Sequence, residues 1–263
     1  MAISGEQAAT YGTPWSRGDL ILAFELYCRI PFKKTKANNP DVIELARFLN
    51  RTPAAVARKL GNFGSLDPEL RKREVAGLGH VGKLDLQIWD EFNSDWNRLV
   101  VEASLLRDAV AAPRALYADD ESPIRLPEGP SEYESLRKNR IHQAFFRDVV
   151  LSSYESTCCI TGICVKEALT ASHIVPWSVS EEHRADPRNG LCLSATFDKL
   201  FDCGLVTVSD EYAVVVSSAL QDHSSEQVRE LICFYHNAPI RRPRRFLPEK
   251  RHLEWHRKHI FHQ

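Results

Sequence analysis

Two neighbouring stretches of the sequence, LTASHIVPWS (residues 169–178) and DPRNGLCLSATFDKLFDCGL (residues 186–205), decide the expected fold of the second half of the chain. The first is an apolar, strand-like segment that contains one histidine, His173. The second opens with an Asn-Gly turn at Asn189 and continues into a short helix that Gly204 is expected to end. A strand, a turn and a short helix therefore follow one another closely.

Further patterns flank these two stretches. Residues 158–177 (CCITGICVKEALTASHIVPW) favour a short β-hairpin that turns near Gly162, and residues 205–218 (LVTVSDEYAVVVSS) favour a second hairpin. Ahead of both, residues 131–156 carry the apolar side of a helix. The second half is therefore predicted to mix helices with small sheets, which makes the fold class of the chain α+β.

The first half of the chain is predicted to be helical. Residues 17–29 form an amphipathic pattern, Asn39-Pro40 signals the start of a second helix, and Thr52-Pro53 signals a third that Gly61 should stop. Three short helices with a tight turn before the last resemble a helix-turn-helix or Myb-like DNA-binding unit. That resemblance implies a groove-facing side that includes Arg58, Lys59 and Asn62. The alternative is a helical packing module with a solvated basic face.

The domain organisation follows from composition. Residues 83–111 add one or two further helices, and residues 111–131, rich in proline and acidic residues, are the expected linker. We therefore expect a helical, DNA-reading domain over residues 1–110 and a second domain with a basic tail over residues 132–263.

Length and composition are those of an ordinary globular protein. The chain has 263 residues, of which 43% are hydrophobic and 26% are charged. It contains no run of eighteen apolar residues and no recognisable secretion signal at its start, so neither a membrane span nor secretion is expected. The seven cysteines are odd in number and lack zinc-ribbon spacing. This pattern favours reduced thiols in a cytoplasmic protein and makes structural zinc unlikely.

Charge is unevenly distributed although the formal net charge is only −1. Four arginines surround Pro243 in the tail, and the helix before the second domain has a polar face. Phosphate contacts are the functional interpretation of both, a solvated face is the alternative for the helix, and nuclear localisation is the lesser alternative for the tail. The candidate DNA-contacting residues of these two regions are Arg140, Gln143, Arg241, Arg242, Arg244 and Arg245.

The spacing of three side chains indicates phosphodiester chemistry. Such a reaction needs a base for the attacking water and positive charge near the phosphate, and a histidine with one hard cation supplies both. His173 lies on the strand, while Asp198 and Asp202 project from one face of the short helix. Two carboxylates on consecutive turns make a partial cage for Mg²⁺ or Mn²⁺. Taken singly, a strand histidine is more often a core residue, and Asp202 could be a helix-end residue.

The pattern CITG, ASHIVPW, NGLCL and FDCGL resembles the HNH (ββα-metal) endonucleases, in particular restriction-like bacterial members, over about residues 137–220. The resemblance implies a ββα-metal domain in which His173 activates water as the general base. It also implies that Asn189 pins the loop and orients the histidine backbone. His183, in the polar stretch SEEHRADP, is interpreted as a solvated loop residue.

The chain departs from the family at two positions. Phe197 stands where related sequences often have a histidine, and Ser172 stands where they often have a metal ligand. In nuclease toxins of the colicin type, metal-binding histidines follow the asparagine by about nine and thirteen residues, and these offsets fall here on Asp198 and Asp202. Two carboxylates favour Mg²⁺ or Mn²⁺ over Zn²⁺.

The leading functional hypothesis is a metal-dependent endonuclease that cuts double-stranded DNA, of the restriction or defence type. One such site in each chain favours a homodimer for cutting both strands. Two alternatives stay open: a DNA-binding protein with a degenerate HNH fold, which Phe197 and Ser172 suggest, and a nuclease toxin or RNase.

Overall fold

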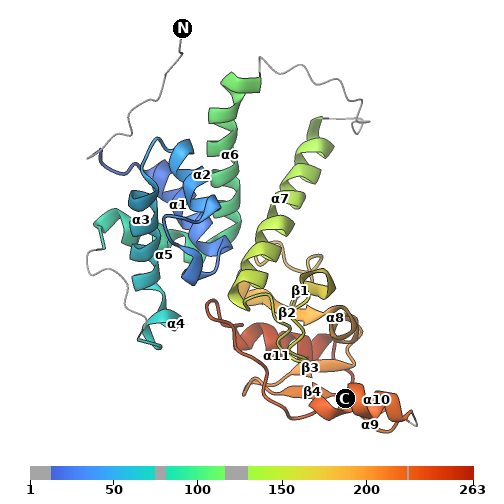
Figure 1. Ribbon diagram of the computed structural model, residues 1–263. Helices are drawn as coiled ribbons and strands as arrows, with labels where there is room; N and C mark the ends of the chain where they lie inside the picture. Colours follow the sequence, from blue (N-terminus) through green and yellow to red (C-terminus); the bar gives the residue numbers. More distant parts are fainter. Residues whose placement is uncertain (1–12, 75–80, 116–129, 224) are drawn as a thin grey trace. The chain divides into compact units, whose positions relative to one another are not determined.

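The computed structural model describes residues 13–74, 81–115, 130–223 and 225–263. The chain splits into two compact units, Met1–Ile141 and His142–Gln263 (Figure 1). Of the predicted linker at 111–131, residues 116–129 lie outside the described part of the chain.

The first unit is helical in its described part. Its elements are α1 (Arg17–Arg29), the 3₁₀ turn η1 (Phe32–Lys34), α2 (Pro40–Phe48), α3 (Pro53–Leu66), α4 (Pro68–Arg71), α5 (Lys83–Ser94), α6 (Trp96–Ala115) and the first turns of α7 (Pro130–Ser153). Helix α1 packs against α2, α3, α5 and α6 and is buried on most of its surface, which places it at the centre of this unit. Phe24 of α1 and Phe63 of α3 meet there with ring centroids 5.0 Å apart.

The predicted helix starts of α2 and α3 are confirmed. The Asn39 side chain accepts a hydrogen bond from the Asp41 backbone N–H at 2.8 Å, and Thr52 caps α3 through Ala55. The predicted stop at Gly61 is wrong, because α3 continues to Leu66. A glycine is needed at position 64 inside α3 for close packing, since an added Cβ there would lie 2.1 Å from the Phe32 ring.

Lys59 and Asn62 of α3 point into the first unit. The Lys59 ammonium lies 2.8 Å from the Asp85 carboxylate of α5, and the Asn62 amide donates to the same carboxylate at 3.0 Å. Asp85 is only 1% exposed. A buried carboxylate needs such partners, because an unpaired charge in the interior is costly. These two residues hold α3 to α5, so a direct DNA contact is not retained for either of them.

The second unit contains two small antiparallel sheets with helices around them (Figure 1). Its elements after α7 are η2 (Lys166–Ala168), β1 (Leu169–His173), η3 (Pro187–Asn189), β2 (Gly190–Ser194), α8 (Ala195–Asp202), β3 (Val206–Val208), β4 (Val214–Val216), α9 (Ser218–Gln221), α10 (Glu226–Leu231), η4 (Cys233–Tyr235) and α11 (Lys250–His259). The predicted hairpin after Phe201 is confirmed, since β3 pairs with β4. Gly204 follows α8 with a φ of +70°, as expected for a helix end.

The predicted hairpin within residues 158–177 is wrong. Strand β1 pairs with β2 across the long loop 174–189, with His173 opposite Gly190 and Leu169 opposite Ser194. Residues ahead of β1 form turns instead, in which Gly162 has a φ of +76°. The sequence therefore located β1 correctly but assigned it the wrong partner.

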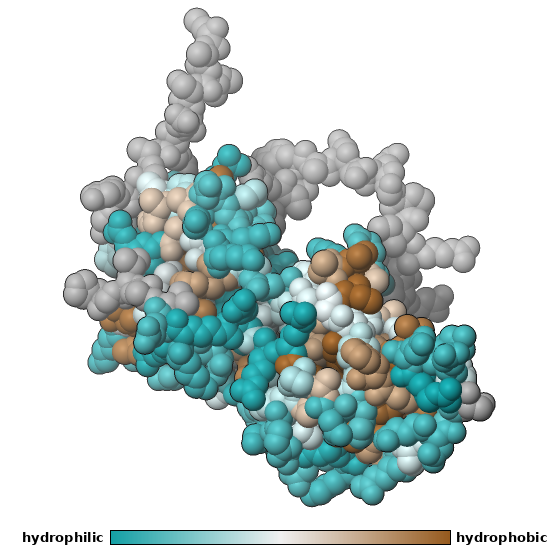
Figure 2. Space-filling model, turned by 60° about the horizontal axis from the view of Figure 1, so that its bottom comes forward, coloured by the Kyte–Doolittle hydropathy of each residue, from teal (hydrophilic) through white to brown (hydrophobic). Residues whose placement is uncertain are grey.

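The surface of the second unit carries some apolar side chains among polar ones, as the brown areas of Figure 2 show. The large hydrophobic side chains exposed in this unit are Ile163, Val165, Val179, Leu231 and Phe234. Within the described residues, no helix has the length and apolar character needed to cross a membrane.

Candidate active site

The long loop between β1 and β2 is fixed from inside by Asn189. The amide oxygen of Asn189 accepts a hydrogen bond from the Val175 backbone N–H at 2.8 Å, and its amide nitrogen donates to the Val175 carbonyl at 3.0 Å. A weaker contact of 3.4 Å joins the same nitrogen to the His183 carbonyl. Asn189 is 1% exposed, so these bonds form away from competing water. Val175, at the start of the loop, and Asn189, at its end, are thereby held together.

His173 stands at the end of β1 with one ring nitrogen engaged by the same loop. Its Nε2 lies 3.0 Å from the Arg184 carbonyl oxygen. A carbonyl can only accept, so Nε2 carries the proton and Nδ1 keeps the lone pair in the neutral ring. No hydrogen bond to Nδ1 occurs within the described part of the chain. This is the tautomer in which Nδ1 can take a proton.

Burial keeps the His173 ring neutral. Loss of hydration lowers the pKa of His173 to about 4, although the hydrogen bond to the Arg184 carbonyl opposes that shift. The ring stacks on Phe146 of α7 with centroids 3.6 Å apart and meets Trp177 edge-on at 5.6 Å. His173 is half-buried rather than sealed off. At neutral pH it is an unprotonated imidazole in a fixed orientation.

The sequence did not reveal three parts of this environment. Phe146 belongs to a helix that begins before the motif, and Arg184 acts through its backbone oxygen, which any residue type would provide. The Arg184 guanidinium lies 5.0 Å from the Trp177 ring centre and donates to the Trp177 carbonyl, which braces the loop.

Gly190 lets α7 approach the strand pair. An added Cβ at this position would lie 2.5 Å from Val150 and 2.9 Å from Phe146. The backbone there is extended, with a φ of −131°, so the requirement for glycine is one of space. Because Phe146 is also the residue stacked on His173, this contact fixes the ring beneath the imidazole.

The two candidate metal ligands lie on α8, as predicted from their spacing. Asp198 is half-buried and Asp202 is exposed. Partial loss of hydration, followed by the nearby Asp198 carboxylate, raises the pKa of Asp202. Two carboxylates that repel each other in this way fit a divalent cation, which would relieve the repulsion. Among the described residues, no group of three or more His, Cys, Asp or Glu side chains is placed to hold a metal ion.

The two positions at which the sequence departs from the HNH pattern are both buried. Phe197 is 2% exposed and its ring meets Tyr235 of η4 edge-on at 5.4 Å, so position 197 faces the core. Ser172 is 3% exposed, and its hydroxyl has no hydrogen-bond partner in the described residues. Consecutive strand residues face opposite ways, so Ser172 and His173 lie on opposite sides of β1.

Helix α11 holds α8 in place through a buried histidine. His256 is 2% exposed, stacks on Phe201 of α8 and donates from Nε2 to the Phe201 carbonyl at 3.0 Å. Its Nδ1 lies 2.9 Å from the Thr207 hydroxyl of β3, which donates to it. Burial lowers the pKa of His256 to about 4. The helix that carries the aspartates is thus anchored by a neutral imidazole.

The predicted DNA-contacting residues divide into exposed and buried ones. Arg58 in the first unit and Arg140, Gln143, Arg241, Arg242 and Arg244 are exposed. Arg244 lies 3.2 Å from Glu155. Arg245 is 1% exposed and donates to the Ser152 hydroxyl, so it belongs to the interior and is not retained as a phosphate contact.

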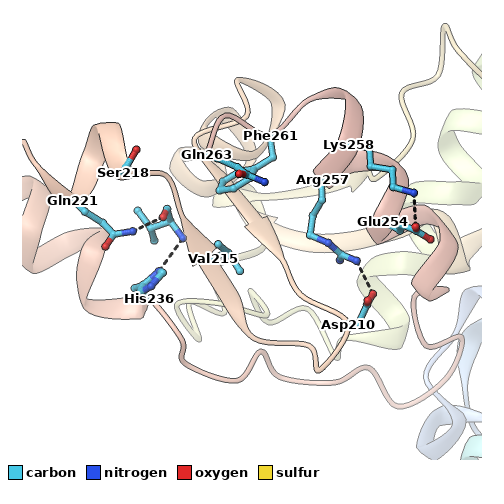
Figure 3. Close-up of a pocket in the computed structure, with 11 residues that line it drawn as sticks. Asp210, Val215, Ser218, Gln221, His236, Glu254, Arg257, Lys258, Phe261 and Gln263 are labelled. Atoms are coloured by element: carbon cyan, nitrogen blue, oxygen red, sulfur yellow. Dashed lines mark hydrogen bonds and ion pairs between the residues drawn. The ribbon is translucent and has the colours of Figure 1, made fainter.

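A cavity of about 790 Å³ lies elsewhere in the second unit, beside β4, α9 and α11 (Figure 3). Two of its cationic side chains are already paired, Arg257 with Asp210 at 2.6 Å and Lys258 with Glu254. Its lining includes neither His173 and Asn189 nor the two aspartates of α8. The cavity is therefore separate from the candidate active site.

The buried histidines make the stability of the chain depend on pH. The unfolded chain protonates its imidazoles near pH 6.5, whereas folding lowers the pKa of His173 and of His256 to about 4. Between these values the unfolded state binds more protons, so the free energy of unfolding should fall by about 1.4 kcal/mol per pH unit for each imidazole as the pH drops. Above pH 6.5 this contribution should be constant.

Urea unfolding at a series of pH values measures this slope. His256→Gln should make the slope between pH 6.5 and 5 shallower, while His223→Gln, at an exposed position of the same unit, should leave it as in the wild type. Equal slopes in all three proteins would show that the buried imidazole of His256 does not titrate as inferred.

Comparison with known families agrees with the resemblance seen in the sequence. Residues 158–209 match the family described as HNH endonuclease. The matched segment contains β1, the pinned loop, β2 and α8. A search of curated proteins found no match to this chain.

Proposed function

We propose that this chain, whose residues 158–209 match the HNH endonuclease family, is a metal-dependent nuclease that hydrolyses phosphodiester bonds of double-stranded DNA. The observation that carries the proposal is the state of His173. It is a neutral imidazole with its Nε2–H held by a backbone carbonyl and its Nδ1 without a partner in the described residues. A histidine that acts as the general base for water must be unprotonated and have a free ring nitrogen, as His173 does in the described part of the chain.

In this mechanism Nδ1 of His173 takes a proton from the attacking water as its oxygen bonds to phosphorus. The bond between phosphorus and the leaving oxygen breaks, and the imidazole becomes a cation. The Arg184 carbonyl, which already accepts from Nε2, stabilises that cation as its positive charge develops. Asn189 contributes by holding the loop that carries this carbonyl.

Asp198 and Asp202 would hold one divalent cation, Mg²⁺ or Mn²⁺. Oxygen ligands suit these hard ions, and two protein ligands leave positions for water and for the scissile phosphate. When bound, the ion would supply positive charge at the phosphate and at the leaving oxygen. The inference for these residues rests on their adjacency on α8 and on the raised pKa of Asp202, to which the Asp198 carboxylate contributes after burial.

DNA contacts in this proposal come from the exposed basic residues of both units. Arg58 is exposed on α3, one residue before Lys59, and the two offer a matched pair of variants. Arg58→Gln should weaken DNA binding and reduce the slope of log affinity against log salt by about 1, because one phosphate contact is lost. Lys59→Gln should instead lower the free energy of unfolding by about 3 kcal/mol, because it leaves the buried Asp85 without its cation.

Fluorescence anisotropy over a salt series and urea unfolding of both variants separate the two effects. An unchanged salt slope in Arg58→Gln, with the fold intact, would remove α3 from the proposed DNA-reading surface. The first unit would then be a packing module.

The biological role that we propose is restriction or defence in the cytoplasm, with a homodimer that cuts both strands. A degenerate HNH fold that only binds DNA is the second candidate. Phe197 in the core and the absence of a third metal-ligating side chain near the aspartates, within the described residues, favour it. A nuclease toxin or RNase is the third candidate.

Substrate preference distinguishes these candidates. The purified chain should nick supercoiled plasmid in Mg²⁺ and leave a single-stranded RNA of similar length intact under the same conditions. Cleavage of the RNA alone would contradict DNA as the substrate and would favour a nuclease toxin or RNase. Binding of plasmid without cleavage of either substrate would favour the degenerate fold.

A further inference from the structure

A histidine of helix α11 is buried in the second unit. His252 of α11 is 3% exposed, and its Nδ1 lies 3.2 Å from the Arg188 carbonyl. The carbonyl accepts, so Nδ1 carries the proton and Nε2 keeps the lone pair. Within the described residues Nε2 has no partner. A buried acceptor of this kind costs free energy unless something binds to it.

A second imidazole lies directly beside it. The ring centroids of His183 and His252 are 4.7 Å apart, with planes inclined at 55°. A tetrahedral ion with metal–nitrogen bonds of about 2.0–2.1 Å holds two imidazole centres roughly 5 Å apart. His183 is half-buried, which corrects the expectation of a solvated loop residue and leaves the pair accessible to a small ion.

The surroundings of the pair favour a cation. The carboxylates of Asp186 and Glu249 lie near His252, where both favour positive charge. Arg188 pairs with these carboxylates at 2.8 and 2.9 Å, which accounts for one of their two charges. The hydrogen bond from Nδ1 of His252 to a backbone carbonyl is the arrangement that orients histidine ligands in metal sites.

We propose that His183 and His252 bind one borderline transition-metal ion such as Zn²⁺, with water completing its coordination. Imidazole nitrogen suits such an ion, whereas the paired carboxylates of α8 suit Mg²⁺ or Mn²⁺. The site has fewer protein ligands than a typical structural zinc site, so its affinity is expected to be modest.

The ion would brace the active-site loop from behind. His183 and Arg184 are adjacent, and the carbonyls of these two residues accept from Asn189 and from His173. His252 lies on α11, whose N-terminus is joined to the loop by the Glu249–Arg188 ion pair. An ion shared by His183 and His252 would therefore link α11 to the segment that orients the general base.

Calorimetric titration of the metal-free, reduced full chain with Zn²⁺ tests the proposal. The wild type should bind one ion through this pair and gain thermal stability on binding. His183→Gln should bind Zn²⁺ about tenfold or more weakly, the scale on which metal affinity responds to loss of even an outer-shell partner. The same variant should lose the zinc-dependent stabilisation. His183 is half-buried, so this substitution leaves the core intact.

Two exposed positions in the same unit serve as controls, His223→Gln and Cys203→Ser, and both should bind as the wild type does. The proposal is overturned if the wild type binds no Zn²⁺, if His183→Gln binds as tightly as the wild type, or if Cys203→Ser alone abolishes binding. None of these measurements uses nuclease activity, so they are independent of the proposed reaction.

Discussion

His173→Ala should reduce the rate of DNA cleavage by a factor of roughly 10² to 10⁴, the usual contribution of a general base. That range corresponds to about 3–5 kcal/mol of transition-state stabilisation. DNA affinity should stay nearly unchanged, because the ring lies between Phe146 and Trp177 and donates to a loop carbonyl. Single-turnover cleavage of a labelled duplex at saturating protein, with affinity measured separately, checks both expectations.

The substitution also removes a ring that stacks on Phe146, so the fold must be checked by thermal unfolding of the same preparation. His223→Ala, at an exposed position, is the matched control and should cleave at the wild-type rate. Wild-type cleavage by His173→Ala would eliminate this histidine as the base.

Asp198→Asn is expected to have the second largest effect. It keeps the shape of the side chain but removes a charge that a hard divalent cation requires. The concentration of Mg²⁺ needed for half-maximal cleavage should rise by about ten- to a hundredfold, the scale on which metal sites respond even to loss of an outer-shell partner. A Mg²⁺ titration of the cleavage rate measures this shift.

Asp202→Asn should shift the Mg²⁺ requirement less, because Asp202 is exposed at the end of α8 while Asp198 is half-buried. Glu226→Gln, which neutralises an exposed carboxylate on α10, is the control and should leave the Mg²⁺ requirement as in the wild type. Equal Mg²⁺ requirements in Asp198→Asn and in the wild type would show that the ion is held elsewhere.

The part of the fold that local chemistry determines was predictable from the sequence. Asn39 and Thr52 cap their helices, and Gly204 follows α8 in a left-handed conformation, because each effect acts within a few residues. The hairpin after Phe201 was predicted for the same reason. Pairing of β1 with β2 spans the loop 174–189, and no local signal determines it.

Contacts between distant parts of the chain determine whether a candidate site residue faces solvent or the interior. The sequence identified Lys59, Asn62 and Arg245 by residue type and spacing, but buried partners in other elements engage all three. Asp85 binds the first two, and Ser152 accepts from Arg245. A polar or charged side chain looks the same in the sequence whether it faces solvent or a buried partner. Tertiary packing alone distinguishes the two cases.

The surroundings of His173 also depend on contacts that the sequence does not reveal. The spacing of His173, Asn189 and the α8 aspartates was visible in the sequence. The tautomer was not, because it depends on a backbone oxygen eleven residues away. The stack of His173 on Phe146 depends on the close approach of α7 to β2, which requires a glycine at position 190. The sequence alone indicated only that Gly190 is part of a turn.

The proposed function requires that this chain, which matches the HNH endonuclease family over residues 158–209, be a working, metal-dependent nuclease. Conversion of supercoiled plasmid to open circles by the metal-free wild-type chain, with and without added Mg²⁺ or Mn²⁺, tests it most directly. We expect nicking with either ion, none after EDTA, and recovery when excess ion is restored. A folded wild-type chain that binds the plasmid but leaves it supercoiled with both ions would contradict the claim.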